Sequence, residues 1–72
     1  MINYKKAGYR IQTQRKILGL TQEVVSEKIG ITPSFFSQIE SGTRKAGIKT
    51  FVSISKVLGI SLDYIFDIET DK

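Results

Sequence analysis

The sequence contains no cysteine and no histidine. Disulfide bonds and thiolate metal sites therefore cannot stabilise the chain, and the residues that most often act as zinc ligands or catalytic bases are missing. No apolar run approaches the roughly 18 residues of a membrane helix, and the N-terminus MINYKKAGYR lacks the apolar segment of a signal peptide. We therefore expect a cytoplasmic protein without metal, cofactor, catalytic residues or membrane contact, which is not an enzyme.

The charge of the chain is uneven along its length. The 72 residues carry 11 Lys and Arg against 7 Asp and Glu, a formal net charge of +4. Through Lys56 the balance is +7, whereas residues 57–72 carry −3. This asymmetry fits a protein that meets phosphates with its basic part. The length allows one domain over residues 1–72, with a core at about residues 4–66 and a frayed acidic tail at residues 67–72.

Residues 21–42, TQEVVSEKIGITPSFFSQIESG, predict two short helices joined by a tight turn. Thr21 can accept hydrogen bonds from the free N–H groups of the first helix, and Gly30 can end that helix in the left-handed conformation. Thr32 is then the cap of the second helix and Pro33 its first residue. Only one residue lies between Gly30 and Thr32, so the connection between the two helices must be a tight turn.

The outward face of the second helix is polar yet uncharged. Phe36 and Ile39 are spaced to point inward, and the outward residues are then Ser34, Phe35, Ser37, Gln38 and Ser41. A solvated helix face usually carries Glu and Lys. Glutamine can donate and accept at adenine N6 and N7, and serine can bond to either kind of base-edge group. The face therefore suits the reading of DNA bases, although a plain hydrated surface is the alternative.

The remaining helices are expected at about Tyr4–Leu18, at Ile48–Leu58 and after Ser61, because apolar residues there recur at spacings of three and four. Gln14 occupies an inward position, where we expect its amide to cap a neighbouring group. The expected inward residues are Ala7, Ile11, Leu18, Val25, Ile29, Phe51, Ile54, Ser55, Leu58, Leu62, Ile65 and Phe66. Nothing alternates like a strand, so the prediction is an all-α, compact five-helix bundle.

These residues resemble the helix-turn-helix of the phage-repressor and Cro family of small DNA-binding regulators, the Xre type. The similarity extends over roughly Tyr4 to Phe66. The matching residues are Gly8, Ile11, Arg15, Gly19-Leu20-Thr21-Gln22, Gly30, Ser37, Ile39-Glu40, Gly42 and Leu58-Gly59-Ile60-Ser61-Leu62-Asp63. The resemblance implies a lambda-repressor-like DNA-binding domain.

The resemblance also implies which residues touch double-stranded DNA. Base contacts fall on Ser34, Phe35, Ser37 and Gln38, and backbone contacts on Thr21, Gln22, Thr32, Thr43, Arg44 and Lys45. For Gln22 the alternative is a capping role, and for the loop cations it is plain solvation. In place of the family's frequent Pro-Ser, the chain has Ala46-Gly47, so we expect a weakly capped following helix and a more flexible loop.

Arg15 and Glu40 occupy positions that form a buried or half-buried ion pair in members of the family. A bidentate pair would lock the first helix against the end of the second helix of the pair, which we call the recognition helix. The alternative is that both side chains lie on the surface.

The function that follows is a sequence-specific transcription regulator, by default a repressor, that reads a two-fold operator as a homodimer. The expected dimer surface contains Val57, Ile60 and Tyr64. One alternative is a protein-interaction module such as an antitoxin, in which an exposed Phe35 anchors the partner. Another is a small activator or controller protein that contacts RNA polymerase.

Overall fold

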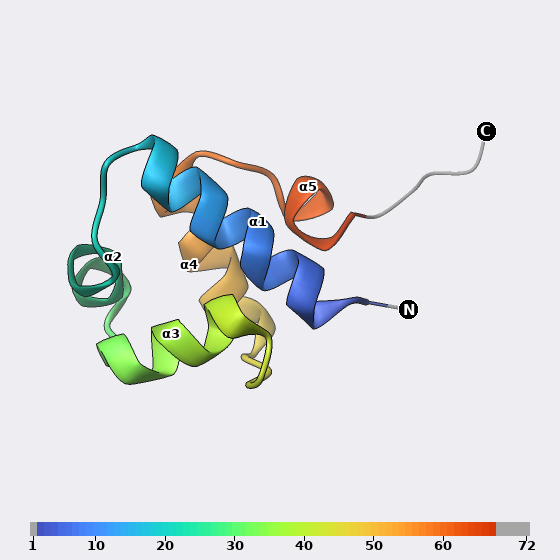
Figure 1. Cartoon of the computed structure of the whole chain (residues 1–72), viewed down its shortest axis with the longest axis horizontal. Helices are drawn as coiled ribbons and strands as arrows, with labels where there is room; N and C mark the ends of the chain where they lie inside the picture. Colours follow the sequence, from blue (N-terminus) through green and yellow to red (C-terminus); the bar gives the residue numbers. More distant parts are fainter. Residues whose placement is uncertain (1, 68–72) are drawn as a thin grey trace.

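The computed structural model describes residues 2–67, which form five helices and no strand. These helices are α1 (Tyr4–Ile17), α2 (Gln22–Ile29), α3 (Pro33–Ser41), α4 (Ile48–Leu58) and α5 (Leu62–Phe66). Figure 1 shows α1 crossing the middle of the molecule, with α3 along one side of it and α2 at one end. The all-α, five-helix class predicted from the sequence is confirmed. None of the described helices is long and apolar enough to cross a membrane.

Local sequence signals set the ends of α2 and α3. Thr21 Oγ1 and Thr32 Oγ1 each accept a hydrogen bond of 3.1 Å from a backbone N–H in the first turn of their helix. Gly30 and Gly42 end the two helices with φ of +79°, a conformation that costs glycine little because it has no Cβ. The boundaries predicted for this helix pair are confirmed.

The ends of α1 differ from the prediction. Asn3 caps the helix by accepting a hydrogen bond of 3.0 Å from the Lys6 N–H, a role that the sequence analysis did not assign. The helix ends at Ile17, and Leu18 is 46% exposed. The expectation that Leu18 points inward is wrong, because the chain leaves the helix there to enter the turn at Gly19, whose φ is +72°.

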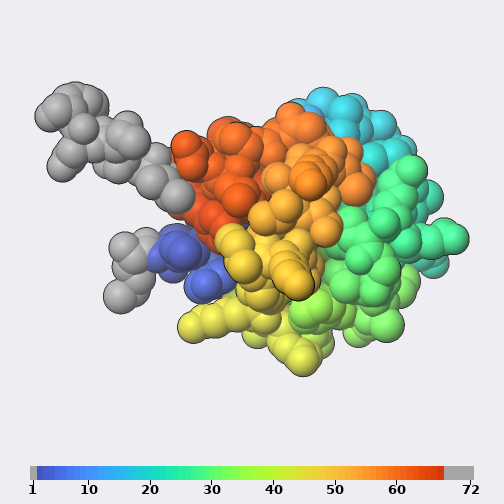
Figure 2. Space-filling model, turned by 180° about the vertical axis from the view of Figure 1, so that it is seen from behind, coloured from blue at the N-terminus to red at the C-terminus, as the bar shows by residue number. Residues whose placement is uncertain are grey.

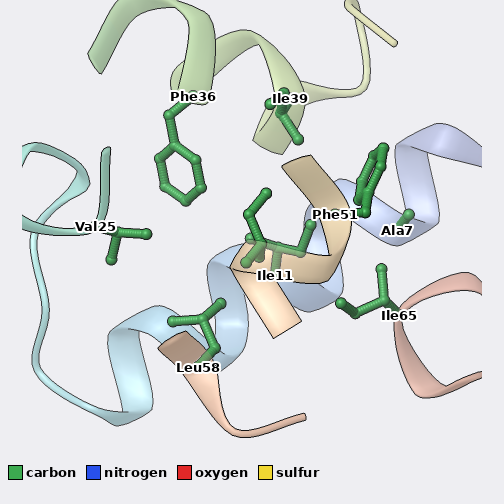
Figure 3. Packing of buried hydrophobic residues seen from close by; sticks show 9 residues of the cluster. Ala7, Ile11, Val25, Phe36, Ile39, Phe51, Leu58 and Ile65 are labelled. Carbon is green, nitrogen blue, oxygen red and sulfur yellow. The ribbon is translucent and has the colours of Figure 1, made fainter. Parts of the chain in front are cut away.

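One apolar core joins all five helices. The side chains of Figure 3 converge on its centre from every helix, and Ile11 of α1 lies near the middle. Ser55 is only half-buried, against expectation, and its hydroxyl donates to the Val52 carbonyl oxygen at 2.9 Å. The buried apolar residues are Ala7, Ile11, Val25, Phe36, Ile39, Phe51, Ile54, Leu58 and Ile65. Ile29, Leu62 and Phe66 pack against this core while staying partly exposed.

Helix α4 is attached to α1 at its C-terminal end. Gln14 Nε2 donates to the Leu58 carbonyl oxygen at 3.1 Å, which confirms the expected capping role of this amide. At the N-terminal end of α4, Gly47 makes no capping hydrogen bond, as expected for a residue without a side chain.

Helix α5 is clamped onto α1 by charged side chains. Asp67 lies 2.8 Å from Lys6 Nζ and 3.3 Å from Arg10 Nη1. Arg10 Nη1 also donates to the Tyr64 carbonyl oxygen at 2.6 Å, and the Arg10 Cζ lies 4.7 Å from the centre of the Tyr64 ring. Asp67 is the first residue of the predicted frayed tail, and two cations of α1 hold its carboxylate. The rest of that predicted tail lies outside the described residues.

Candidate nucleic-acid interface

The backbones of α1 and α3 approach closely at Gly8. A Cβ at this position would lie against the backbone carbonyl groups of Ile39 and Glu40. Gly8 is therefore needed for space, since its backbone conformation is ordinary for a helix. The close approach holds the C-terminal half of α3 against α1 and turns the opposite face of α3 away from the protein.

Glu40 and Arg15 form a buried ion pair beneath the C-terminal half of α3. Arg15 Nε lies 2.6 Å from Glu40 Oε2, and Arg15 Nη2 lies 3.1 Å from Glu40 Oε1. The side chains are 9% and 1% exposed. The same carboxylate accepts hydrogen bonds from Gln22 Nε2 at 2.8 Å and from Gln12 Nε2 at 3.4 Å. The pair is thus bidentate and its lone pairs are well occupied, the arrangement in which a buried charge is tolerated.

Two consequences follow from the partners of Glu40. The single carboxylate of α3 is neutralised inside the protein, so its charge does not face a ligand bound to the outer face of the helix. The amide of Gln22 links α2 to α3 from the inside, a role that was not assigned from the sequence. This link depends on two residues 18 positions apart, and local sequence signals do not report such contacts.

Four of the five residues that were predicted to face outward on α3 are exposed. Ser34, Ser37, Gln38 and Ser41 are exposed. Phe35 departs from the expectation of an outward aromatic residue. Its side chain is half-buried and packs partly against the core. It sits at the edge of the face, where only part of its ring reaches solvent.

The loop after α3 is held against the helix. Thr43 N–H donates to the Gln38 carbonyl oxygen at 3.1 Å, and Arg44 Nη1 donates to Gln38 Oε1 at 3.3 Å. The Arg44 Cζ lies 5.3 Å from the centre of the Phe35 ring, and Lys45 Nζ lies 5.4 Å from that of Tyr4. The sequence predicted a flexible loop here. Instead, both of its cations already lie against aromatic rings of α3 and α1.

Lys5 adds a third cation at this end of α3, and it was not among the residues predicted from the sequence to contact DNA. It is exposed in the first turn of α1, and its Cα lies 2.6 Å from where a Cβ on Gly42 would stand. Figure 2 shows the first residues of α1, in blue, beside the loop after α3, in yellow. The exposed uncharged face therefore ends at a cluster of positive charge formed by Lys5, Arg44 and Lys45, which we call the basic cluster.

Residues 2–67 contain no group of three or more acidic, histidine or cysteine side chains that could hold a metal ion. What the described part of the chain offers a ligand is hydroxyl and amide groups on one helix face, with cations beside them. Such a surface can hydrogen-bond to bases and attract phosphates.

Comparisons with known proteins agree with this geometry. A family model described as helix-turn-helix matches residues 11–65. The uncharacterized HTH-type transcriptional regulator YqaE of Bacillus subtilis (strain 168) is 38% identical over 58 residues, which are 81% of this chain and 50% of YqaE. The chain spans about half the length of such curated relatives, covering 50% of YqaE and 43% of an uncharacterized HTH-type transcriptional regulator of Sinorhizobium medicae (strain WSM419).

Two solved structures have the same fold. The restriction-modification controller protein C.AhdI from Aeromonas hydrophila has a TM-score of 0.81 and 25% identity, over 88% of this chain and 96% of that one. The P22 c2 repressor protein, solved in complex with a synthetic operator, has a TM-score of 0.79 and 28% identity. That match covers 83% of this chain and 91% of the repressor chain.

Proposed function

Because the chain belongs to the Xre-type helix-turn-helix family of DNA-binding transcription regulators, we propose that it binds specific DNA sequences by inserting α3 into the major groove. The observation that carries this proposal is the exposed, uncharged polar face of α3, with its one carboxylate buried in an ion pair. A carboxylate on that face would be repelled by phosphate, whereas hydroxyl and amide groups can bond to base edges. We propose that this DNA-binding domain acts in the cytoplasm.

The base contacts proposed for α3 come from Ser34, Ser37 and Gln38. All three are exposed and lie on the face opposite the buried residues of the helix. Phe35 is half-buried, so we assign it an apolar contact from the exposed part of its ring, to a thymine methyl group or a sugar.

Contacts to the DNA backbone are proposed at both ends of the helix pair. Each cation that neutralises a phosphate contributes about 0.9 to the slope of log affinity against log salt. Lys5 joins the residues expected from the sequence because it lies beside Gly42. The proposed backbone contacts are Thr21, Gln22, Thr32, Thr43, Arg44, Lys45 and Lys5.

We propose that the active form is a homodimer on a two-fold operator, because one such helix reads only a few base pairs. The proposed surface lies on α4 and α5. Tyr64 is 47% exposed there, and Val57 and Ile60 keep part of their surface exposed while packing on the core. Sedimentation equilibrium at tens of micromolar, with and without operator DNA, tests this. A monomer under both conditions would refute it.

Repression is the mode of action we propose, since a bound domain can block a promoter by occupying it. The P22 c2 relative is named a repressor, and this supports the proposal. C.AhdI is named a restriction-modification controller protein, and this supports a controller protein as a second candidate. If it acts as an activator, such a protein would contact RNA polymerase as well as DNA. The antitoxin-like alternative needs an exposed aromatic anchor. Phe35 does not favour it, because its ring is half-buried and has Arg44 beside it.

Selection of bound sequences from a randomised duplex pool tests the proposed function. We expect an enriched site with two related halves about one helical turn apart, because two copies of α3 would enter adjacent major grooves. A reporter gene placed behind the enriched site then separates repression from activation. A selected pool without any common motif would contradict sequence-specific binding.

A further inference from the structure

Phe35, Gln38 and Arg44 form a small cluster at the edge of the proposed DNA-reading face. Arg44 Nη1 donates to Gln38 Oε1 at 3.3 Å, and the Arg44 Cζ lies 5.3 Å from the centre of the Phe35 ring. Gly42 turns the chain back over α3 with its φ of +79°. The Thr43 N–H then bonds to the Gln38 carbonyl oxygen at 3.1 Å. The backbone itself therefore brings Arg44 over the side chain of Gln38.

The chemistry of the two side chains fixes which way the Gln38 amide faces. A guanidinium group has five N–H donors and no acceptor, so only the carbonyl oxygen of an amide can bond to it. The amide NH2 group of Gln38 consequently points away from Arg44. Turning the amide over would bring two donor groups together and lose the hydrogen bond.

We propose that Arg44 is a positioning residue that makes Gln38 present donors to the groove, so that Gln38 selects guanine over adenine at the base pair it meets. This inference rests on the proposed function. Guanine presents two acceptors, N7 and O6, in the major groove, and the NH2 group of the amide can donate to them. Adenine presents an acceptor beside a donor, so its bidentate recognition needs Oε1 to face the base, whereas the hydrogen bond from Arg44 turns Oε1 toward the loop.

Arg44 can keep this role while it binds phosphate. Its planar fork leaves the Nε and Nη2 donors available for a phosphate oxygen while Nη1 stays on Gln38. A lysine at this position would carry the same charge, but concentrated on one ammonium group. A phosphate would draw that group away from the neutral Oε1 of Gln38. Lys45, its neighbour in the loop, lies over Tyr4 instead. Lys45 is therefore the matched control for charge without positioning.

The test compares the wild-type protein with Arg44→Lys and Lys45→Gln on two operator duplexes. These duplexes carry either guanine or adenine at the one position where Gln38→Ala loses discrimination. The wild type should prefer guanine by roughly tenfold or more. Arg44→Lys should lose most of this preference with its salt slope unchanged. Lys45→Gln should keep the preference, while its salt slope falls by about one unit.

A further variant checks that Arg44 acts through the amide. In a Gln38→Ala background, Arg44→Lys should not change the guanine-to-adenine ratio, since there is no amide left to orient. The inference is overturned if the wild type prefers adenine, or if Arg44→Lys keeps the full guanine preference. In either case the wild type still discriminates between sites, so the proposed function stands. A wild type without any site preference would instead refute the proposed function itself.

Discussion

Glu40 and Gly8 both hold α3 against α1. Glu40 carries its charge inward, to Arg15, and Gly8 provides the space in which the C-terminal end of α3 meets α1. Both lie in α1 or on the inner side of α3, and neither is placed to touch DNA. Both residues act by packing α3 against α1. The free energy of unfolding is therefore the property that their replacement should change.

Replacement of Glu40 by alanine should strongly destabilise the protein. The variant leaves the buried guanidinium of Arg15 without its partner, and breaking a buried pair in this way costs about 3–5 kcal/mol. Thermal unfolding of Glu40→Ala and Glu27→Ala gives the comparison. Glu27 is exposed on α2, so its removal should change stability by about 0.5 kcal/mol or less. Equal losses in the two variants would remove the structural role of the pair.

Gly8→Ala should also destabilise, although alanine favours helices by about 1 kcal/mol over glycine. The new methyl group would press on backbone atoms of α3, which cannot rotate away, and such overpacking costs about 1–3 kcal/mol. Chemical denaturation measures the change. Lys16→Ala, at an exposed position of the same helix, serves as control. A Gly8→Ala variant as stable as this control would show that the two helices can move apart at little cost.

At the scale of helices, the sequence predicted those helix ends that depend on residues within four positions of each other. The cap at Thr21, the start at Thr32-Pro33 and the end at Gly30 are all local, and all were placed correctly. Most side-chain contacts between elements could not be predicted from such local signals, and the Arg15–Glu40 pair was expected only from the family resemblance. The bond from Gln22 to Glu40 joins different helices, and that from Arg44 to Gln38 joins a loop to α3. They depend on how the helices pack and on which rotamers then fit.

Helix α4 offers a way to stabilise the fold. Its N-cap is Gly47, with φ of −72° and ψ of 165°, and a Cβ there would meet nothing within 4 Å. Gly47→Ser should raise the free energy of unfolding by about 0.5–1 kcal/mol, because serine caps the helix and restricts the unfolded chain. Gly30→Ser is the matched contrast and should destabilise, since φ at Gly30 is +79°. Thermal unfolding that ranks the two variants in the opposite order would contradict this account.

The clamp between α1 and α5 predicts a pH dependence. The hydrogen bond from Lys6 and the charge of Arg10 hold the pKa of Asp67 below its usual value of 3.8. A carboxylate whose pKa is lowered by folding adds stability above its unfolded pKa, and this contribution is lost as the pH falls through the folded pKa. Asp67→Asn should therefore be less stable than the wild type at pH 7, with the difference shrinking below about pH 4. A difference that is constant from pH 7 to pH 3 would mean that the carboxylate charge does not hold α5.

In the whole molecule, some charged side chains form ion pairs within the protein and others lie at its surface. Arg15, Lys6 and Arg10 form ion pairs within the protein, whereas the cations of the basic cluster are exposed at the end of the uncharged face of α3. The fold class and the exposed polar face of α3 could be predicted from the sequence, since both depend on helical periodicity and helix-end signals. The basic cluster could not be predicted in full, because Lys5 reaches it only once α1 packs beside Gly42.

The most direct test is a competition titration of the wild-type protein against its selected duplex and a scrambled duplex, repeated over a range of salt concentrations. We predict that the selected duplex binds roughly a thousandfold or more tightly than the scrambled one. Both affinities should fall steeply as salt rises, because cations of the protein displace counterions from DNA. Equal affinity for the two duplexes, or affinity that does not respond to salt, would contradict the claim that α3 reads DNA.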